Sequence, residues 1–263
     1  MKRSRLFLAT GHAACVVFCV ILMYPLGVMI SKSLRNNGLG NYLRVFREVD
    51  ILPNFRTSVL VVFGTMFLVA MVTSMAAFAF SKLNFPGKKL IYFILLSAMM
   101  IPTAAILFPL FFIVRGLRLI NSPWALIFPY VTLNAVFNLL ILKNFFDSFP
   151  RELMEAATID GANTFGIYFR IMMPISVPGL SIVLIQTFLA AWNELQMGMT
   201  FINRPRLQPI SVVPLRFVQT VAATYPIEVM YASLVICLLP IALFYIGAQK
   251  FLIKGLSAGA IKG

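Results

Sequence analysis

Charged residues, histidine and cysteine are all scarce in this chain of 263 residues. Only 11% of the residues are Asp, Glu, Lys or Arg and 60% are hydrophobic, which would leave a soluble globule too little polar surface. Long apolar runs between short polar segments instead indicate a helical membrane protein. The formal net charge of +14 comes from basic residues that cluster between those runs. Their position favours the lipid bilayer as their partner and argues against nucleic acid.

The single histidine and the three cysteines make a metal or redox centre hard to assemble. Cys15, Cys19 and Cys237 fall within apolar runs, and no pair has the spacing of a metal or redox motif. His12 lies near the start of the first run, where we expect an interfacial structural role rather than a ligand role. A P-loop and other phosphate-cradling glycine motifs are also missing. The sequence therefore predicts no catalytic residue, no metal site and no cofactor in this chain.

Six apolar segments are long enough to cross about 30 Å of hydrocarbon, which takes about 20 helical residues. Basic residues precede the first segment as in a secretory signal, but its apolar stretch is long and has no convincing cleavage site, so we expect a retained helix. Pro102 and Pro109 predict breaks in the third segment. We predict an all-α membrane protein with six transmembrane helices in a single domain, residues 1–263. The predicted spans are residues 6–31, 57–80, 90–114, 124–142, 179–202 and 231–251.

Few polar residues interrupt these spans. A charged side chain at mid-bilayer costs about 2.5 to 3.5 kcal/mol on insertion scales, so Glu194 in AAWNELQMG needs a reason. Either Glu194 lines a polar cavity with Asn193, or it is hydrated at the interface beside Trp192. Asn138 either lines a path or hydrogen-bonds a neighbouring helix. We predict Asn193, Glu194 and Asn138 as pathway-lining residues, and a lone ionisable group argues against a proton relay.

A polar segment, residues 143–178, separates the fourth and fifth spans and contains four of the eight acidic residues of the chain. Pro150 suits the first turn of a helix, acidic residues favour its N-terminal end, and Gly161 suits a left-handed stop. We therefore predict a short helix over residues 150–160. Asn163 or Thr164 should cap a following amphipathic helix that runs to Pro174.

One face of the first short helix is predicted to be flat and acidic. At about 100° per residue, Leu153, Ala156, Ala157 and Asp160 fall on or beside one face. This face is flat because two of its side chains are the methyl groups of alanines. An interfacial helix that lies in lipid headgroups is usually rich in Lys and Arg, whereas acids outnumber bases here. This segment is therefore expected to dock onto a basic groove of another protein.

The spacing of this segment resembles the EAA loop of ATP-binding-cassette importer permeases. Glu155-Ala156-Ala157 is followed after three residues by Gly161, and Ile171 and Met173-Pro174 follow at the family's spacing. Met173 replaces the leucine that is usual in the family. Further stretches resemble the carbohydrate-uptake permeases of the maltose type, specifically the smaller, six-helix partner: AAFAFSKLNFPGKK, MMIPTAAILFPLFFIVRGLRLINSPWALIFPY, FFDSFPRELMEAATIDGAN and the terminal KGLSAGAIKG.

The resemblance implies a transporter subunit rather than an enzyme. It implies a cytoplasmic helix-turn-helix coupling loop over residues 143–178, which docks on a separate ATPase dimer that binds ATP and Mg. The implied coupling residues are Leu153, Glu155, Ala156, Ala157, Asp160, Gly161 and Pro174. The implied contacts of the C-terminal tail with the ATPases are Gly255, Ser257, Gly259 and Lys262, although a frayed terminus is the alternative.

The resemblance also implies the surroundings of the chain. They are the bacterial cytoplasmic (inner) membrane with both termini cytoplasmic, a second permease subunit, an extracytoplasmic solute-binding protein and a di- or oligosaccharide substrate. Residues 204–231 and 32–56 are then the candidate contacts of the binding protein, or simple extracellular caps. Glycerol-3-phosphate or a polyol is the alternative substrate. From other classes, an ion-coupled secondary transporter and a membrane scaffold stay open.

Overall fold

The computed structural model describes residues 2–218 and 225–260, and the side chains of residues 10–218 and 225–250. Within these residues the chain is almost entirely helical and contains no strand. It divides into two compact units, which we call unit 1 and unit 2. Unit 1 comprises Met1–Ile51 and Val213–Pro240, and unit 2 comprises Leu52–Val212 and Ile241–Gly263.

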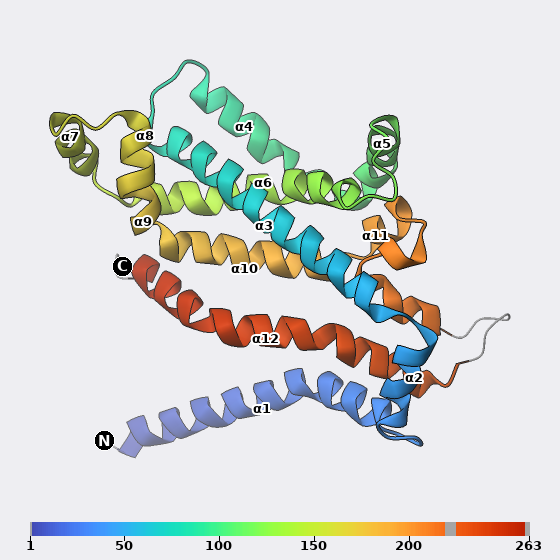
Figure 1. Ribbon diagram of the computed structural model, residues 1–263. Helices are drawn as coiled ribbons and strands as arrows, with labels where there is room; N and C mark the ends of the chain where they lie inside the picture. Colours follow the sequence, from blue (N-terminus) through green and yellow to red (C-terminus); the bar gives the residue numbers. More distant parts are fainter. Residues whose placement is uncertain (1, 219–224, 261–263) are drawn as a thin grey trace. The chain divides into compact units, whose positions relative to one another are not determined.

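Unit 1 is built around a long helix whose apolar surface the chain itself leaves bare. It contains α1 (Lys2–Ser33), α2 (Gly40–Glu48) and the first part of α12 (Ile227–Ala260) (Figure 1). The Asn41 side chain donates to the carbonyls of Ser33 and Arg35, both at 2.9 Å, and so fixes the turn after α1. None of the apolar window of Thr10–Ser33 is buried, so this helix needs lipid or another protein around it.

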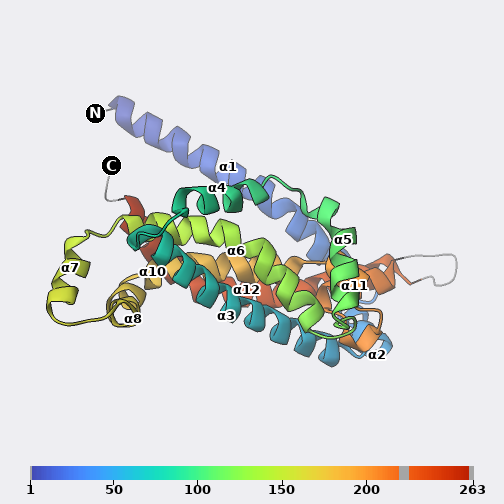
Figure 2. The same cartoon turned by 90° about the horizontal axis from the view of Figure 1, so that it is seen from above.

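Unit 2 packs long helices side by side, with further helices at both ends. Figures 1 and 2 agree that α7 and α8 lie at one end of α6, and α5 and α11 at the other. The long elements are α3 (Ile51–Lys82), α4 (Lys88–Ala98), α5 (Thr103–Gly116), α6 (Trp124–Asp147) and α10 (Val177–Asn193). The short ones are α7 (Glu152–Ile159), α8 (Thr164–Ile167), α9 (Met173–Ile175), α11 (Gln196–Phe201) and the 3-10 turn η2 (Pro205–Leu207).

The span count agrees with the sequence prediction only if bent helices count as single crossings. Four described helices are long and apolar enough to cross a membrane: Thr10–Ser33, Ile51–Lys82, Trp124–Asp147 and Ile227–Lys250. Two bent pairs bring the number up to six, Lys88–Ala98 with Thr103–Gly116 and Thr164–Ile175 with Val177–Asn193. The predicted third span, residues 90–114, is therefore no single straight helix.

The bends have local causes. Between α4 and α5 the chain turns by 101° at Pro102, whose backbone is extended, since proline supplies no N–H to continue a helix. Pro109 lies inside α5 and does not end it. The predicted fifth span, residues 179–202, is interrupted because α10 ends at Asn193 and Glu194 adopts an extended conformation before α11 begins.

Close packing at Gly179 holds α10 against α6. A Cβ atom at Gly179 would lie 2.7 Å from Cγ of Phe145, so this position accepts no side chain without moving the ring. About two helical turns further along, the Asn138 amide donates to Thr187 Oγ1 at 3.1 Å and joins the same two helices. Small residues and interhelical hydrogen bonds are the usual means of helix association in lipid.

Gly179→Ala is therefore expected to destabilise the chain by about 1–3 kcal/mol, because the phenyl ring must shift in a packed site. The measurement is the temperature at which the detergent-solubilised protein loses its monodisperse chromatographic peak. Gly247→Ala is the matched control in α12, since a Cβ atom there meets nothing within 4 Å. Equal midpoints for the two variants would contradict the proposed packing.

Candidate functional site

The polar segment between α6 and α10 forms a surface that we call the ledge, residues 152–175. Glu152 and Glu155 lie in the first turn of α7, where the helix dipole favours negative charge. The helix ends at Ile159, and Gly161 follows with φ of +82°, a conformation that costs other residues free energy. The backbone at Gly161 thus has the left-handed stop that the sequence predicts.

The second arm of the ledge begins at a side-chain cap. Asn163 Oδ1 accepts a hydrogen bond from the backbone N–H of Gly166 at 2.7 Å. After α8 the chain forms a π-helix over Tyr168–Met172, which continues into α9. Ile167, Tyr168 and Met172 are buried, whereas the aromatic rings of Phe165 and Phe169 are exposed. The arm is amphipathic, as the sequence indicates, but its aromatic residues divide between the two faces.

The outer face of α7 has no partner within the described residues. Leu153 and Ile159 are 44% and 85% exposed, and Glu155 and Ala156 are exposed beside them. Of the predicted coupling residues, Leu153, Glu155, Ala156, Asp160, Gly161 and Pro174 all lie exposed on the ledge. Ala157 differs, because it is 6% exposed and turns inward. The predicted flat face is thus split at Ala157, which joins the core.

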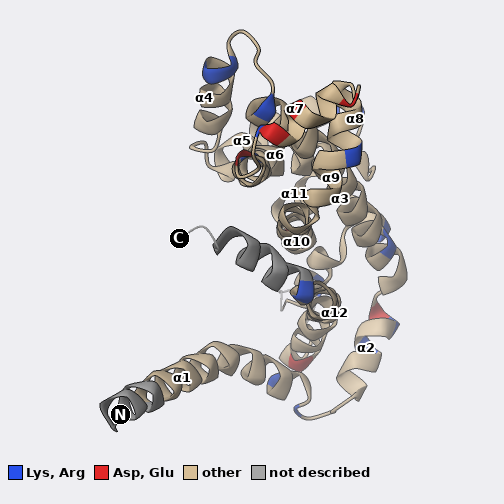
Figure 3. Ribbon diagram, turned by 90° about the vertical axis from the view of Figure 1, so that its left-hand side faces the viewer, with Lys and Arg blue, Asp and Glu red and all other residues tan. Residues whose placement is uncertain are grey.

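A concave surface of mixed charge lies beside α7. It has a volume of about 520 Å³. In Figure 3, which faces this end of unit 2, acidic positions colour α7 and the adjoining end of α6, and basic positions colour the start of α4. A partner that enters this cavity meets one carboxylate, two cations and an apolar rim. Its lining residues are Lys82, Arg151, Met154, Glu155, Thr158 and Ile159.

The inner face of the ledge is bonded to α3 and packs against α3 and α6. The hydroxyls of Tyr168 and Ser74 lie 2.7 Å apart, and the Tyr168 ring lies 5.4 Å from that of Phe78. Nearby, Lys82 donates to the carbonyl of Phe149 at 2.7 Å, and Ser81 donates to Asp147 at 2.6 Å. The Tyr168 bond ties the second arm of the ledge to α3, and the other two bonds join the end of α3 to the end of α6 and the turn after it, beside the ledge.

The contact between Tyr168 and Ser74 was not predicted from the sequence. A serine within an apolar run and a tyrosine on the buried side of an amphipathic helix are the signals that could have found it. Ser74 also donates to the carbonyl of Ala70, which uses its single hydroxyl proton. The Tyr168 hydroxyl is therefore the donor in this bond.

Removal of the Tyr168 hydroxyl and removal of the Ser74 hydroxyl should lower the stability by different amounts. Tyr168→Phe leaves Ser74 bonded to Ala70 and is expected to cost about 1 kcal/mol of stability, the net worth of one hydrogen bond. Ser74→Ala leaves a buried tyrosine hydroxyl without its acceptor and should cost about 1–3 kcal/mol. A double-mutant cycle on thermal stability measures the coupling, and purely additive losses would argue against the bond.

Glu194 forms a second polar site in unit 2, at the opposite end from the ledge. Its carboxylate accepts from the backbone N–H of Met197 at 2.9 Å and from that of Gly198 at 3.3 Å, and from the Tyr130 hydroxyl at 2.6 Å. Ser211 donates to its backbone carbonyl at 2.7 Å. Glu194 thus caps α11 and joins it to α6, and these bonds give the carboxylate a structural reason to lie there.

The other two predicted pathway residues lie in different surroundings. Asn193 is exposed, and its side chain donates to the carbonyl of Leu189 at 2.9 Å. Asn138 is fully buried against Thr187, and its Oδ1 atom has no hydrogen-bond partner among the described residues. A pathway role for Asn138, Asn193 and Glu194 stays a prediction, while the contacts of Asn138 and Glu194 join helices.

The capping role of Glu194 can be separated from a charge-dependent pathway role. Glu194→Gln keeps an acceptor for the α11 amides and should retain most of the thermal stability, whereas Glu194→Ala should lose about 1–3 kcal/mol. Both variants remove the charge, so the measurement compares their unfolding midpoints. Identical large losses in the two variants would mean that the charge, rather than the cap, is what stabilises this site.

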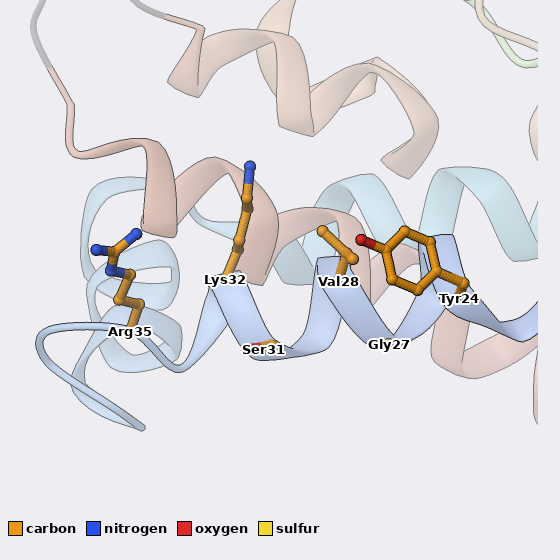
Figure 4. Close-up of a pocket in the computed structure, with 6 residues that line it drawn as sticks. All are labelled: Tyr24, Gly27, Val28, Ser31, Lys32 and Arg35. Atoms are coloured by element: carbon orange, nitrogen blue, oxygen red, sulfur yellow. The ribbon is translucent and has the colours of Figure 1, made fainter.

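Unit 1 also has a concave surface, on one face of α1. It has a volume of about 730 Å³, and its lining includes the small residues Gly27 and Ser31. Figure 4 shows Lys32, Arg35 and Tyr24 projecting to the same side of the helix. The Lys32 ammonium also lies 5.3 Å from the ring centre of Tyr231. The surface combines two cations with an apolar wall at the end of a candidate span.

Several predicted sites fall beyond the described side chains. Gly255, Ser257 and Gly259 lie in the last turns of α12, where only the backbone is described, and Lys262 lies outside the described residues. The predicted outer segment, residues 204–231, contains η2 and η3 (Ile210–Phe217) and the start of α12, and its residues 219–224 are also outside.

These features define a class of protein: a helical membrane protein that presents a short, acidic, unpartnered helix. Residues 70–258 match the model of the family described as the binding-protein-dependent transport system inner membrane component. The chain therefore belongs to this family of membrane transport subunits, which are not themselves enzymes.

Curated relatives cover nearly the whole chain. It is 33% identical to the sulfoquinovosyl glycerol transport system permease protein SmoH of Agrobacterium fabrum, over 86% of this chain and 78% of SmoH. It is 31% identical to the trehalose/maltose transport system permease protein MalG of Thermococcus litoralis, over 86% and 81%. It is 26% identical to the diacetylchitobiose uptake system permease protein NgcG of Streptomyces coelicolor, over 98% and 90%.

A solved structure shares the fold. A chain of a bacterial ABC transporter involved in the import of the acidic polysaccharide alginate superposes with a TM-score of 0.78 at 20% identity, over 95% of this chain and 98% of that chain. The likeness shows that this chain has the fold of that transporter chain.

Proposed function

We propose that this chain is a permease subunit of an ATP-driven, binding-protein-dependent importer of di- or oligosaccharides. The single observation that carries the coupling role is the ledge, whose acid-bearing helix α7 is exposed on one face and packs on the other, through Ala157, into a core with residues of α3 and α6. The relatives named for saccharide transport support the substrate class. Membership of the family leaves the ion-coupled transporter and the scaffold without support.

The partners follow from the surfaces that the chain leaves bare. A separate ATPase dimer, which carries ATP and Mg, docks on the ledge with Glu155 facing a basic residue and Ala156 permitting close approach. The C-terminal tail reaches the same ATPases. The bare apolar surface of α1 packs against a second permease subunit, which shares the bilayer. With the ledge inside the cell, both termini are cytoplasmic and the chain crosses the bacterial inner membrane.

The ledge transmits movement because it is stiff. When two ATPases close upon ATP, they displace α7. Ala157, Tyr168 and Met172 fill one core with Phe78 and Phe146, so the displacement passes to α3 and α6 instead of being absorbed locally. The long helices then tilt, and the path for the sugar changes from inward-facing to outward-facing. No covalent step takes place in this chain.

Glu155→Lys is expected to reduce ATP-driven uptake about tenfold or more while the permease still inserts, because it places a cation against a basic partner. Glu152→Lys is the matched control: it makes the same charge change in the same exposed turn of α7, but Glu152 does not line the ledge cavity. The measurement is uptake of labelled maltose, trehalose and diacetylchitobiose, with ATP turnover, in proteoliposomes of the co-purified complex. Full coupling in Glu155→Lys, or a purified complex without an ATPase, would refute the proposal.

A further inference from the structure

The concave surface of unit 1, which we call the α1 pocket, follows one face of α1 to the end of the helix and into the turn beyond it. Its lining residues recur at spacings of three and four, as the residues on one helix face do. They are Tyr24, Gly27, Val28, Ser31, Lys32 and Arg35 (Figure 4). None of the apolar window of Thr10–Ser33 is buried, so the chain itself leaves this face open.

The two cations of the α1 pocket are held in place by contacts within unit 1. The Lys32 ammonium lies 5.3 Å from the ring centre of Tyr231 in α12, and the ring attracts it without using up its three N–H donors. The buried Asn41 side chain donates to the carbonyl of Arg35 at 2.9 Å and so fixes the backbone from which the guanidinium extends. The two charges are thus presented together from defined positions.

No carboxylate within the described residues neutralises these two cations. Glu48 pairs with Arg44 at 3.7 Å, and the Glu228 carboxylate accepts from the Asn36 side chain at 2.7 Å. The cations of the α1 pocket form no ion pair in the part of the chain that the structure describes. A guanidinium and an ammonium side by side suit an anion with several acceptor oxygens, above all a phosphate.

The rest of the α1 pocket is suited to an apolar group. Tyr24 and Val28 extend it from the cations toward the middle of the candidate span, and Gly27 leaves room beside them because a Cβ atom there meets nothing within 4 Å. From Tyr24 to Lys32 the helix rises by about 12 Å. One leaflet of a hydrocarbon core of about 30 Å measures about 15 Å. The pocket therefore matches a ligand with an anionic end and an apolar chain of about one leaflet's length.

A protein helix fits this site less well than a lipid does. A helix of the second permease subunit that filled the pocket would cover two cations that have no carboxylate of their own, and burying unpaired charge is costly. The earlier turns of α1, Thr10–Met23, contain no such charge and remain available to that subunit. A phospholipid brings the counter-charge and the apolar chain in one molecule.

We propose that the α1 pocket is a binding site for a phospholipid of net negative charge. Its phosphate binds Lys32 and Arg35, and one acyl chain lies along the small and apolar turns before them. The inference goes beyond the proposed function, because it concerns α1 and does not involve the ledge. With both termini cytoplasmic, the lipid lies in the extracytoplasmic leaflet, but the site itself does not depend on the side.

The experiment measures photolabelling by a phosphatidylglycerol that carries a diazirine in one acyl chain. The tagged full chain, with the subunits that accompany it, is held in nanodiscs, and a protease that does not cut at Lys or Arg releases the peptides. The label should lie in the peptide that contains Tyr24 and Val28. Lys32→Gln/Arg35→Gln should lower this labelling about tenfold or more, since each cation near the headgroups adds to the attraction.

The matched control removes the same number of cations from another helix end. Arg115→Gln/Arg118→Gln neutralises two exposed arginines at the same spacing, at the end of α5, and should leave the labelling of α1 unchanged. Lys32→Arg/Arg35→Lys keeps both charges and should keep most of the labelling, which separates loss of charge from loss of fold.

A second pair of variants tests the shape of the pocket without changing its charge. Gly27→Leu places a side chain in the pocket and should lower the labelling severalfold. Gly11→Leu is the matched control on the same helix, since a Cβ atom there also meets nothing within 4 Å. Equal labelling of these two variants would contradict an acyl chain lying against Gly27.

Three other results would overturn the inference. If phosphatidylcholine with the same diazirine labels the peptide equally, the contact is general contact with lipid. If millimolar glycerol phosphate or inorganic phosphate abolishes the labelling, the site takes a soluble anion. If a photo-reactive residue in place of Val28 attaches to another subunit and lipid does not label the peptide, the pocket is a protein contact. None of these results affects the proposed function, which instead fails if the purified complex contains no ATPase.

Discussion

The burial of the inner side of the ledge against α3 and α6 is the constraint on which the rest of the structure depends. Ala157, Ile167 and Met172 are almost fully enclosed there, and the Tyr168 hydroxyl adds a buried bond to Ser74. A close-packed interior cannot be compressed, so a force on the outer side of α7 reaches the long helices. A methyl side chain at Ala157 permits this approach, since a larger group would hold α7 away from the core.

Polar side chains within the apolar helices mainly connect one helix to another. Asn138 binds Thr187, Glu194 binds Tyr130 and the α11 amides, and the Tyr168 hydroxyl binds Ser74. In hydrocarbon an unpaired polar group is expensive, and each of these pairs joins two different elements. A lone carboxylate near the end of a span is thus explained by the helix break that it caps.

The two ends of unit 2 present different surfaces. The ledge offers carboxylates and an apolar rim around α7, and the far end offers guanidinium groups on three segments held by Asn54 and Asn121. Few charges lie between them, because the intervening helices run through apolar surroundings. Two partners can therefore engage the same unit without competing for one surface.

The sequence by itself determined the helical membrane class, the family, and the local backbone of the ledge. Apolar run lengths, the left-handed glycine at Gly161 and the capping Asn163 act over a few residues, so they are legible in the chain. The inward turn of Ala157 and the bonds that Tyr168 and Glu194 make to Ser74 and Tyr130 were decided by the tertiary structure. Each depends on which distant residue lies opposite, and no spacing along the chain records that.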